Sequence, residues 1–300
     1  PMVDESILKK VKGIPQAALI ANYLMIQKRL AQVRSWLKEL NEDTGRVHGY
    51  VNPNGAVTGR MTHSHPNMAQ IPSSSSPYGK ECRSCWIVPE NYKLVGIDAS
   101  GLELRMLAHY LDDEGYTNEI LNGDIHTANQ KLAGLQSRDQ AKTFIYALLY
   151  GAGDAKLGTV AGRGREAGKR LRQSFFDNLP SFKTLTGRVQ REAAEGYVKG
   201  LDGRKLTVRS AHAALNTLLQ GAGAIIMKQA MILLDGKLKY LDAKFVANVH
   251  DEWQIECHES VADQVGKLGV EAIIEAGKLL NLNCPLDGDY NVGDNWSETH

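Results

Sequence analysis

The spacing of hydrophobic and polar residues divides the chain into a helical start, a strand-rich section, a long helical middle and a mixed end. Apolar residues recur at helical spacing through residues 5–40, which predicts a helix. Residues 47–61, VHGYVNPNGAVTGRM, carry β-forming residues on both sides of Asn52-Pro53-Asn54-Gly55, which predicts a hairpin. Residues 117–200 are almost wholly helical in pattern. The chain therefore mixes strands with a large helical section.

Two predicted strand segments place an acid where a strand ends. The segment KLVGID reads as a strand that ends at Asp98, with Ser100-Gly101 and a helix directly after it. The segment KFVANVHDEWQIECH reads as two strands around a tight turn that contains Asp251. Alone, Asp98 is a helix cap and Asp251 an exposed turn acid. Together they form the oxygen donor set that a pair of Mg²⁺ ions needs, so they predict a two-metal site.

Two long helices carry further signals. In RDQAKTFIYALLYGAG, Arg138, Lys142, Tyr146 and Tyr150 are four residues apart, so we expect them on one face. Two cations followed by two aromatic rings suit a triphosphate joined to a sugar and base, while the alternative is a mixed interfacial stripe. The helix predicted for 214–238 has Gly221 and Gly223 in its interior, which indicates close packing against backbone or a ligand.

Composition narrows the class of protein. The 300 residues are 43% hydrophobic and 23% charged, as in ordinary globular domains, and the net charge is +1. Basic residues gather in 156–173 and 199–209, which are either solvated faces or surfaces that face phosphate. No apolar run approaches about 18 residues and the start has no signal-peptide pattern, so we expect a cytoplasmic protein with no membrane partner. Cys82 and Cys85 form a CxxC without a second pair, which we interpret as incidental.

The sequence resembles the family A DNA polymerases, the class of bacterial DNA polymerase I, and among them the replicative polymerases of T-seven-like bacteriophages. Residues 98–105, DASGLELR, look like motif A; 138–153 look like motif B; and 249–252, VHDE, look like motif C. The resemblance implies an α+β fold: a right-hand palm of antiparallel sheet with helices, plus helical fingers. Its expected boundaries are a residual thumb helix over 1–40, palm over 41–111, fingers over 112–215 and palm again over 216–300.

The resemblance also implies a reaction, in which the primer 3′-hydroxyl attacks a deoxynucleoside triphosphate and pyrophosphate leaves. Asp98, Asp251 and the carbonyl of Ala99 match the ligands of two Mg²⁺ ions, for which Mn²⁺ can substitute. Glu252 matches a supporting catalytic acid, and Lys142 matches a residue that grips the triphosphate and can protonate pyrophosphate. The residues that match nucleotide contacts are Arg138, Lys142, Tyr146, His126, Glu103 and Tyr150.

Two of these nucleotide contacts imply selectivity for the sugar. Glu103 matches a steric gate that packs with Tyr146 near the 2′ position, where a ribose hydroxyl would clash. Tyrosine rather than phenylalanine at position 146 implies acceptance of dideoxynucleotides. The residues that match primer-template contacts are Arg60, Gln70, Arg204, Asn216, Gln220 and His250.

The chain departs from the resemblance in extent. Relatives of this kind carry a 3′–5′ exonuclease domain and a full thumb, neither of which we expect within these 300 residues. We therefore expect either a split polymerase, with a partner chain that supplies the exonuclease and thumb, or a fragment. Thioredoxin binding through this chain is not expected. The other readings are a non-catalytic DNA-binding remnant, a metal-dependent nuclease and a single-subunit RNA polymerase; phage DNA replication is the expected role.

Overall fold

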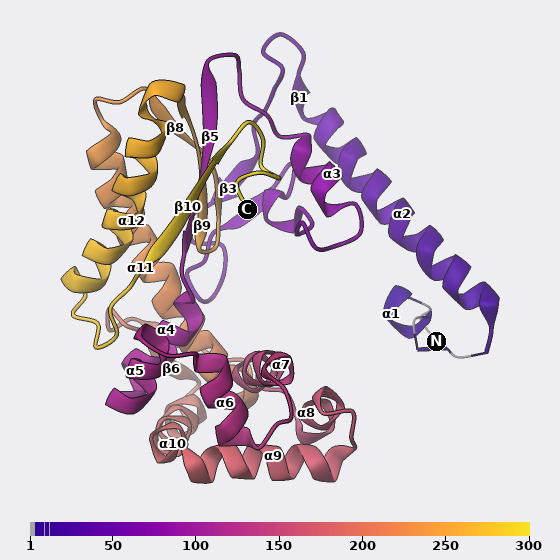
Figure 1. The fold of residues 1–300 in the computed structure, drawn as a ribbon, viewed down its shortest axis with the longest axis vertical. Helices are drawn as coiled ribbons and strands as arrows, with labels where there is room; N and C mark the ends of the chain where they lie inside the picture. The colour runs from indigo at the N-terminus through magenta and orange to yellow at the C-terminus, as the bar shows by residue number, and fades with distance from the viewer. Residues whose placement is uncertain (1–3, 9, 12) are drawn as a thin grey trace.

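The computed structural model describes residues 4–8, 10–11 and 13–300. Its centre is a four-stranded antiparallel sheet in the order β10-β5-β9-β8, seen near the middle of Figure 1. These strands span Tyr92–Ala99 (β5), Ala243–Val249 (β8), Glu252–His258 (β9) and Gly288–Gly293 (β10). Strands far apart in the sequence thus meet in one sheet, and the α+β fold class is confirmed, while the predicted domain boundaries stay a prediction.

One face of this sheet is apolar. Ile97 of β5 and Trp253 and Ile255 of β9 are fully buried on it. They pack toward α12 (Ala262–Leu279), where Gly269 lets the Ile97 side chain approach the helix closely. Burial of each such side chain contributes about 1.5–3 kcal/mol, so this face anchors the sheet.

The opposite face is polar along β9, because side chains alternate across a strand. Glu252, Gln254 and Glu256 share it and are nevertheless buried. Gly96 of β5, which pairs with Gln254, leaves room for Thr299, so the end of the chain lies directly across the strand. A Cβ at position 96 would collide with the Thr299 carbonyl oxygen.

The N-terminal part differs in detail from its prediction. Instead of one helix over 5–40, the structure has α1 (Glu5–Leu8) and α2 (Pro15–Lys38), and residues 9 and 12 lie outside the described residues. α2 projects away from the sheet in Figure 1, and Leu30 and Leu37, two of its regularly spaced apolar residues, are exposed. Helical spacing therefore predicted the helix correctly but could not show that much of its apolar surface stays uncovered.

The predicted hairpin over 47–61 is wrong in its second strand. β3 (Tyr50–Asn52) pairs antiparallel with β4 (Thr62–Ser64), so the returning strand begins after Met61 rather than after Gly55. The intervening residues form turns instead, in which Gly59 adopts a positive φ of 76°. Two further short antiparallel pairs occur elsewhere in the chain: β1 with β2, and β6 with β7. Their bounds are Leu40–Asn41 (β1), Arg46–Val47 (β2), Tyr197–Lys199 (β6) and Lys205–Thr207 (β7).

The helical middle is confirmed. Below the sheet in Figure 1, a group of helices packs around one shared core that includes Phe144, Phe175 and Phe182. The helices that follow β5 are α4 (Leu102–Leu111), α5 (Glu114–Leu121), α6 (Ile125–Ala133), α7 (Arg138–Leu149), α8 (Asp154–Val160), α9 (Arg165–Asn178) and α10 (Pro180–Ala194). Before β5 lie η1 (Met68–Gln70) and α3 (Gly79–Ser84); η2 (Ala211–Ala213) precedes α11 and η3 (Glu259–Val261) precedes α12.

α11 (Ala214–Leu238) joins the sheet half to the helical half. With η2 it is long and apolar enough to cross a membrane by composition, contrary to the expectation that no such run exists, but 56% of that window is buried in the protein. Gly221 and Gly223 allow close packing as expected: Gly221 lies against the Leu206 side chain and near the Thr58 carbonyl oxygen, and Gly223 lies against the Leu102 side chain. The helix is thus part of the core.

Candidate active site

The two strand-end acids lie at the same end of the sheet. β5 and β9 are paired so that Asp98 faces Glu252, and the backbone N–H of Ala99 donates to the carbonyl of Asp251 at 3.0 Å. Asp251 occupies the turn between β8 and β9, after His250 with its positive φ of 60°. Antiparallel pairing therefore brings together two acids that are 153 positions apart, as the difference between their numbers shows.

Asp98 has an unusual electrostatic setting. Water reaches part of its side chain, yet the surrounding protein removes enough hydration to raise its pKa, and Asp251 and Glu252 raise it further, to about 7. Asp289, which faces Asp98 from β10, acts in the same direction and also accepts a hydrogen bond from Ser100 Oγ at 2.8 Å. Acids crowded in this way are stabilised by a bound cation.

The strand-end acids offer oxygen donors of the kind that a hard divalent cation prefers. Among the described residues, no group of three or more His, Cys, Asp or Glu side chains is placed to hold a metal ion. Asp98 and Asp251 with the Ala99 carbonyl still suit Mg²⁺, because this ion is commonly held by one or two carboxylates and keeps other positions for water and substrate phosphate. The raised pKa of Asp98 fits the same interpretation, because the charges of Asp251, Glu252 and Asp289 add to the effect of burial and outweigh the opposing effect of His300.

Glu252 is held firmly rather than free. Its carboxylate accepts hydrogen bonds from Trp296 Nε1 at 2.6 Å, Gln254 Nε2 at 2.5 Å and His300 Nδ1 at 2.7 Å. Burial alone raises the pKa of Glu252, but these hydrogen bonds outweigh it and hold the pKa below the ordinary value. The Arg83 guanidinium lies 4.0 Å away. These contacts fix the carboxylate next to Asp98.

Most of the side chains predicted to form a row along α7 lie on one side of that helix, toward α6. Burial lowers the pKa of His126, and the nearby charges of Arg138 and Lys142 lower it further. The rings of His126 and Tyr146 lie 6.4 Å apart. Arg138, Lys142 and Tyr146 of α7 therefore all lie near His126 of α6. Arg138 Nε also pairs with Asp124 at 2.6 Å, whereas Lys142 is exposed and has no ion-pair partner among the described side chains.

A hydrogen bond joins the end of α7 to α4, the helix that follows β5. Tyr150 Oη donates to Glu103 Oε2 at 3.0 Å, and the Tyr146 and Tyr150 rings stack with centroids 6.5 Å apart. Burial and the Glu103 charge raise the pKa of Tyr150 to about 12, which Arg60 opposes. Burial and Arg60 lower the pKa of His250. Arg60 therefore lies close to Glu103, the predicted steric gate, to Tyr150, and to His250 in the turn between β8 and β9.

The remaining predicted DNA contacts are more scattered. Asn216 and Gln220 lie one turn apart on α11, and the Asn216 Oδ1 atom is buried without a hydrogen-bond partner among the described atoms. Arg204 pairs with Asp202 at 2.6 Å and lies beside Gly59. Gln70 is exposed at the end of η1, and no described contact connects it to the strand-end acids.

Sequence reasoning missed three residues of this region. Asp124 caps α6 and pairs with Arg138; its place before a helix was a readable capping signal. Asp289 faces Asp98 only because β10 pairs with β5. Trp296 reaches Glu252 through the path of the chain end, for which no local sequence signal exists.

Comparison with known proteins gives a consistent result. A family model described as DNA polymerase family A matches residues 1–298. The chain is 45% identical over 344 aligned positions to the DNA-directed DNA polymerase of Enterobacteria phage T3, covering 100% of this chain and 49% of the relative. The DNA-directed DNA polymerase of Escherichia phage T7 gives the same identity and coverage. The chain thus spans about half the length of the curated relatives it matches.

A solved structure agrees in fold. The POL domain of Pol1 from M. smegmatis, in complex with DNA primer-template and dNTP, superposes with a TM-score of 0.88 at 26% identity. The match covers 99% of this chain and 57% of that chain.

Proposed function

The chain belongs to DNA polymerase family A, and from this premise we propose that it adds deoxynucleotides to a primer 3′-hydroxyl on a DNA template. The observation that carries the proposal is the Tyr150–Glu103 hydrogen bond of 3.0 Å. This bond joins the end of α7 to the helix that follows Asp98, which supports the proposal that Arg138 and Lys142 would grip a triphosphate near the acid pair. A nuclease has no need for such a grip.

Asp98, Asp251 and the Ala99 carbonyl would hold two Mg²⁺ ions. Bound there, the ions supply charge neutralisation on the triphosphate and a lowered pKa for the primer hydroxyl. The residues of the chain keep the acids in register: the Ala99 N–H fixes the Asp251 backbone, and Glu252 contributes a fixed negative charge beside them. Exchange of Mn²⁺ for Mg²⁺ is expected to preserve activity, because both are oxygen-preferring cations.

Lys142 and Arg138 would bind the triphosphate, and His126, whose pKa is lowered by burial and by both cations, would act as a neutral hydrogen-bonding partner. Lys142 is the stronger candidate for a proton donor to pyrophosphate, because its ammonium group is exposed and has no carboxylate partner among the described residues. Arg138 has to exchange its contact with Asp124 for the phosphate. An ion pair this exposed costs little to break.

Tyr146 and Tyr150 would stack near the incoming and templating bases, and Glu103 would exclude a ribose 2′-hydroxyl. Glu103 lies close enough to Tyr146 for its charge to raise the tyrosine pKa further, after the effect of burial. Arg60, Gln70, Asn216, Gln220, Arg204 and His250 would contact the primer-template duplex. Donors of this kind read the minor-groove acceptors common to all correct base pairs.

We further propose that this synthesis serves phage DNA replication in the cytoplasm of a host cell, in line with the relatives from phages T3 and T7. The rest of the polymerase that these relatives contain would work with this chain, either as a partner chain with exonuclease and thumb or as part of a longer polypeptide. The two arrangements differ in whether that remaining polypeptide is a separate chain or is joined covalently to this one.

Primer extension tests the proposal. The chain, alone and with the complementary half of a family A polymerase, is mixed with a labelled primer-template, four dNTPs and Mg²⁺. We expect extension in at least one arm, and its loss in Asp98→Asn and in Asp251→Asn. Asp43→Asn, which changes an exposed turn acid, is the matched control. Absence of extension in both arms, or normal extension by either acid variant, would refute the proposal.

A further inference from the structure

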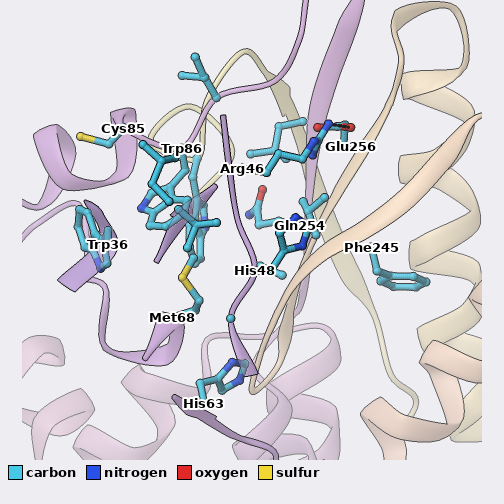
Figure 2. Close-up of a pocket in the computed structure, with 18 of the residues that line it drawn as sticks. Trp36, Arg46, His48, His63, Met68, Cys85, Trp86, Phe245, Gln254 and Glu256 are labelled. Carbon is cyan, nitrogen blue, oxygen red and sulfur yellow. Dashed lines mark hydrogen bonds and ion pairs between the residues drawn. The ribbon is translucent and has the colours of Figure 1, made fainter. Parts of the chain in front are cut away.

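A large pocket lies on the same face of the sheet as the acid pair, further along the strands. Its volume is about 710 Å³, which is within the range of small-molecule sites. Figure 2 shows Trp36, Trp86 and Met68 on one side of it, Arg46, Gln254 and Glu256 on the other, and His63 at its foot. None of the residues assigned above to metal, nucleotide or DNA lines it.

The pocket offers aromatic surface. Trp36 and Trp86 meet edge to face with ring centroids 5.3 Å apart, and Trp296 and Met68 complete this wall. Such indole and thioether surfaces favour a flat, polarisable ring over an aliphatic chain. An aromatic occupant therefore fits this side of the pocket.

Two polar groups in the wall lack well-formed hydrogen bonds among the described atoms. His63 is only 8% exposed, and neither ring nitrogen makes a hydrogen bond of good geometry among the described atoms, although the Asn248 backbone lies near enough to oppose the effect of burial on the His63 pKa. The Trp86 Nε1 atom is likewise buried and unpartnered. Burial lowers the pKa of His63, so the ring is neutral at pH 7 and offers one donor and one acceptor. Buried polar groups without hydrogen-bond partners lower the stability of the folded protein, and a bound molecule that hydrogen-bonds to them removes this cost.

The charged residues that line the pocket indicate whether a bound molecule would be an anion or a cation. Glu256 pairs with Arg46 at 2.7 Å and is thereby neutralised. Lys244, also in the lining, is exposed and has no ion-pair partner among the described side chains. Lys244 lies opposite Glu256 in the register of β8 and β9, so two cations and one carboxylate line the pocket, and their net charge of one positive unit favours an anion.

We propose that this pocket binds a small aromatic anion, a carboxylate or sulfonate, with its rings against the tryptophan wall and its anionic group toward Lys244. The inference concerns binding alone and does not depend on the proposed polymerase activity.

The probe is 1-anilinonaphthalene-8-sulfonate, whose fluorescence rises in an apolar site. Titration of the whole chain is expected to saturate at one equivalent. Val51→Trp fills the mouth and is expected to weaken binding at least tenfold. Val292→Trp is the matched control, because Val51 and Val292 are strand valines with exposures of 40% and 42% and only Val51 lines the pocket. Lys244→Gln is expected to weaken binding severalfold, and Lys278→Gln, outside the pocket, is expected to leave it unchanged.

Cysteine reactivity locates the bound probe. Cys85 lines the pocket and is exposed, whereas the other three cysteines are buried, so a thiol reagent reports on this position first. Saturating probe is expected to slow the modification of Cys85 several-fold, and Cys85→Ser is expected to remove the fast phase. Unsaturable binding, equal affinity in Val51→Trp and Val292→Trp, or an unchanged Cys85 rate would overturn the proposal.

Discussion

The indole Nε1 of Trp296 donates a hydrogen bond to Glu252 Oε1 at 2.6 Å, across 44 positions of sequence. Glu252 is 4% exposed, so its carboxylate depends on such donors in place of water. The contact connects the end of the chain to the strand next to Asp98. Several consequences of this arrangement can be measured.

Replacement of Trp296 by phenylalanine removes the donor and keeps an aromatic ring. We expect the free energy of unfolding to fall, since a hydrogen bond to a charged group contributes about 1.5–3 kcal/mol. Urea unfolding measures the change.

Trp253→Phe is the matched control, because Trp253 is fully buried and its Nε1 has no hydrogen-bond partner among the described atoms. Both variants lose the same atoms, so the difference between them reports on the polar contacts of the Trp296 indole, which are the hydrogen bond to Glu252 and the Arg83 guanidinium 4.8 Å from its ring centroid. Equal losses would contradict the role assigned to the Trp296–Glu252 contact.

Stability should depend on pH through Glu252. Its folded-state pKa is held below the ordinary value of 4.5, chiefly by hydrogen bonds that outweigh burial. A lowered carboxyl pKa contributes stability that is fully present above the unfolded pKa and is lost as pH falls through the folded one. We therefore expect the stability advantage of the native chain over Glu252→Gln to be largest near pH 7 and to shrink below about pH 4.5. Unfolding midpoints from pH 3.5 to 7 measure it, and a constant difference would argue against this assignment.

Gly96→Ala tests the crossing of the chain end over β5. The new Cβ would lie 2.7 Å from Gln254 Nε2 and would collide with the Thr299 carbonyl oxygen. We expect a loss of about 1–3 kcal/mol, as for overpacked cores.

Gly236→Ala provides the opposite case. No atom lies within 4 Å of a Cβ built at this position of α11, so alanine should stabilise the helix by up to about 1 kcal/mol. Thermal unfolding of both variants decides the matter, and a neutral Gly96→Ala would show that the chain end can move away freely.

Tyr146→Phe tests the predicted sugar selectivity and rests on the proposed function. Loss of the hydroxyl is expected to reduce dideoxynucleotide incorporation relative to deoxynucleotide by about tenfold, equal to about 1.4 kcal/mol. Competition between the two nucleotides in primer extension measures the ratio. Tyr150→Phe, which loses the Glu103 contact instead, should leave the ratio nearly unchanged. The same ratio for Tyr146→Phe and the unsubstituted chain would reject the prediction.

The local pattern determined most elements of this protein. The strand before Asp98, the helix from Arg138, the long helix from Ala214 and the strand pair around Asp251 all appear where the sequence predicts them. Each is defined by periodicity or by turn residues within a few positions. The hairpin after Tyr50 was misplaced because Gly55 marks one turn among several, and local turn signals do not identify the strand that pairs.

The sequence by itself, through its motifs and helical spacing, determined the family, the acid pair and the row that faces His126. Only the tertiary structure decided that Asp289 faces Asp98, that Trp296 and His300 hold Glu252, and that a pocket lined by the buried His63 lies on the same face of the sheet. The physical reason is that these relationships depend on strand order and on the path of the chain end. Both are set by non-local pairing, which no short window of sequence contains.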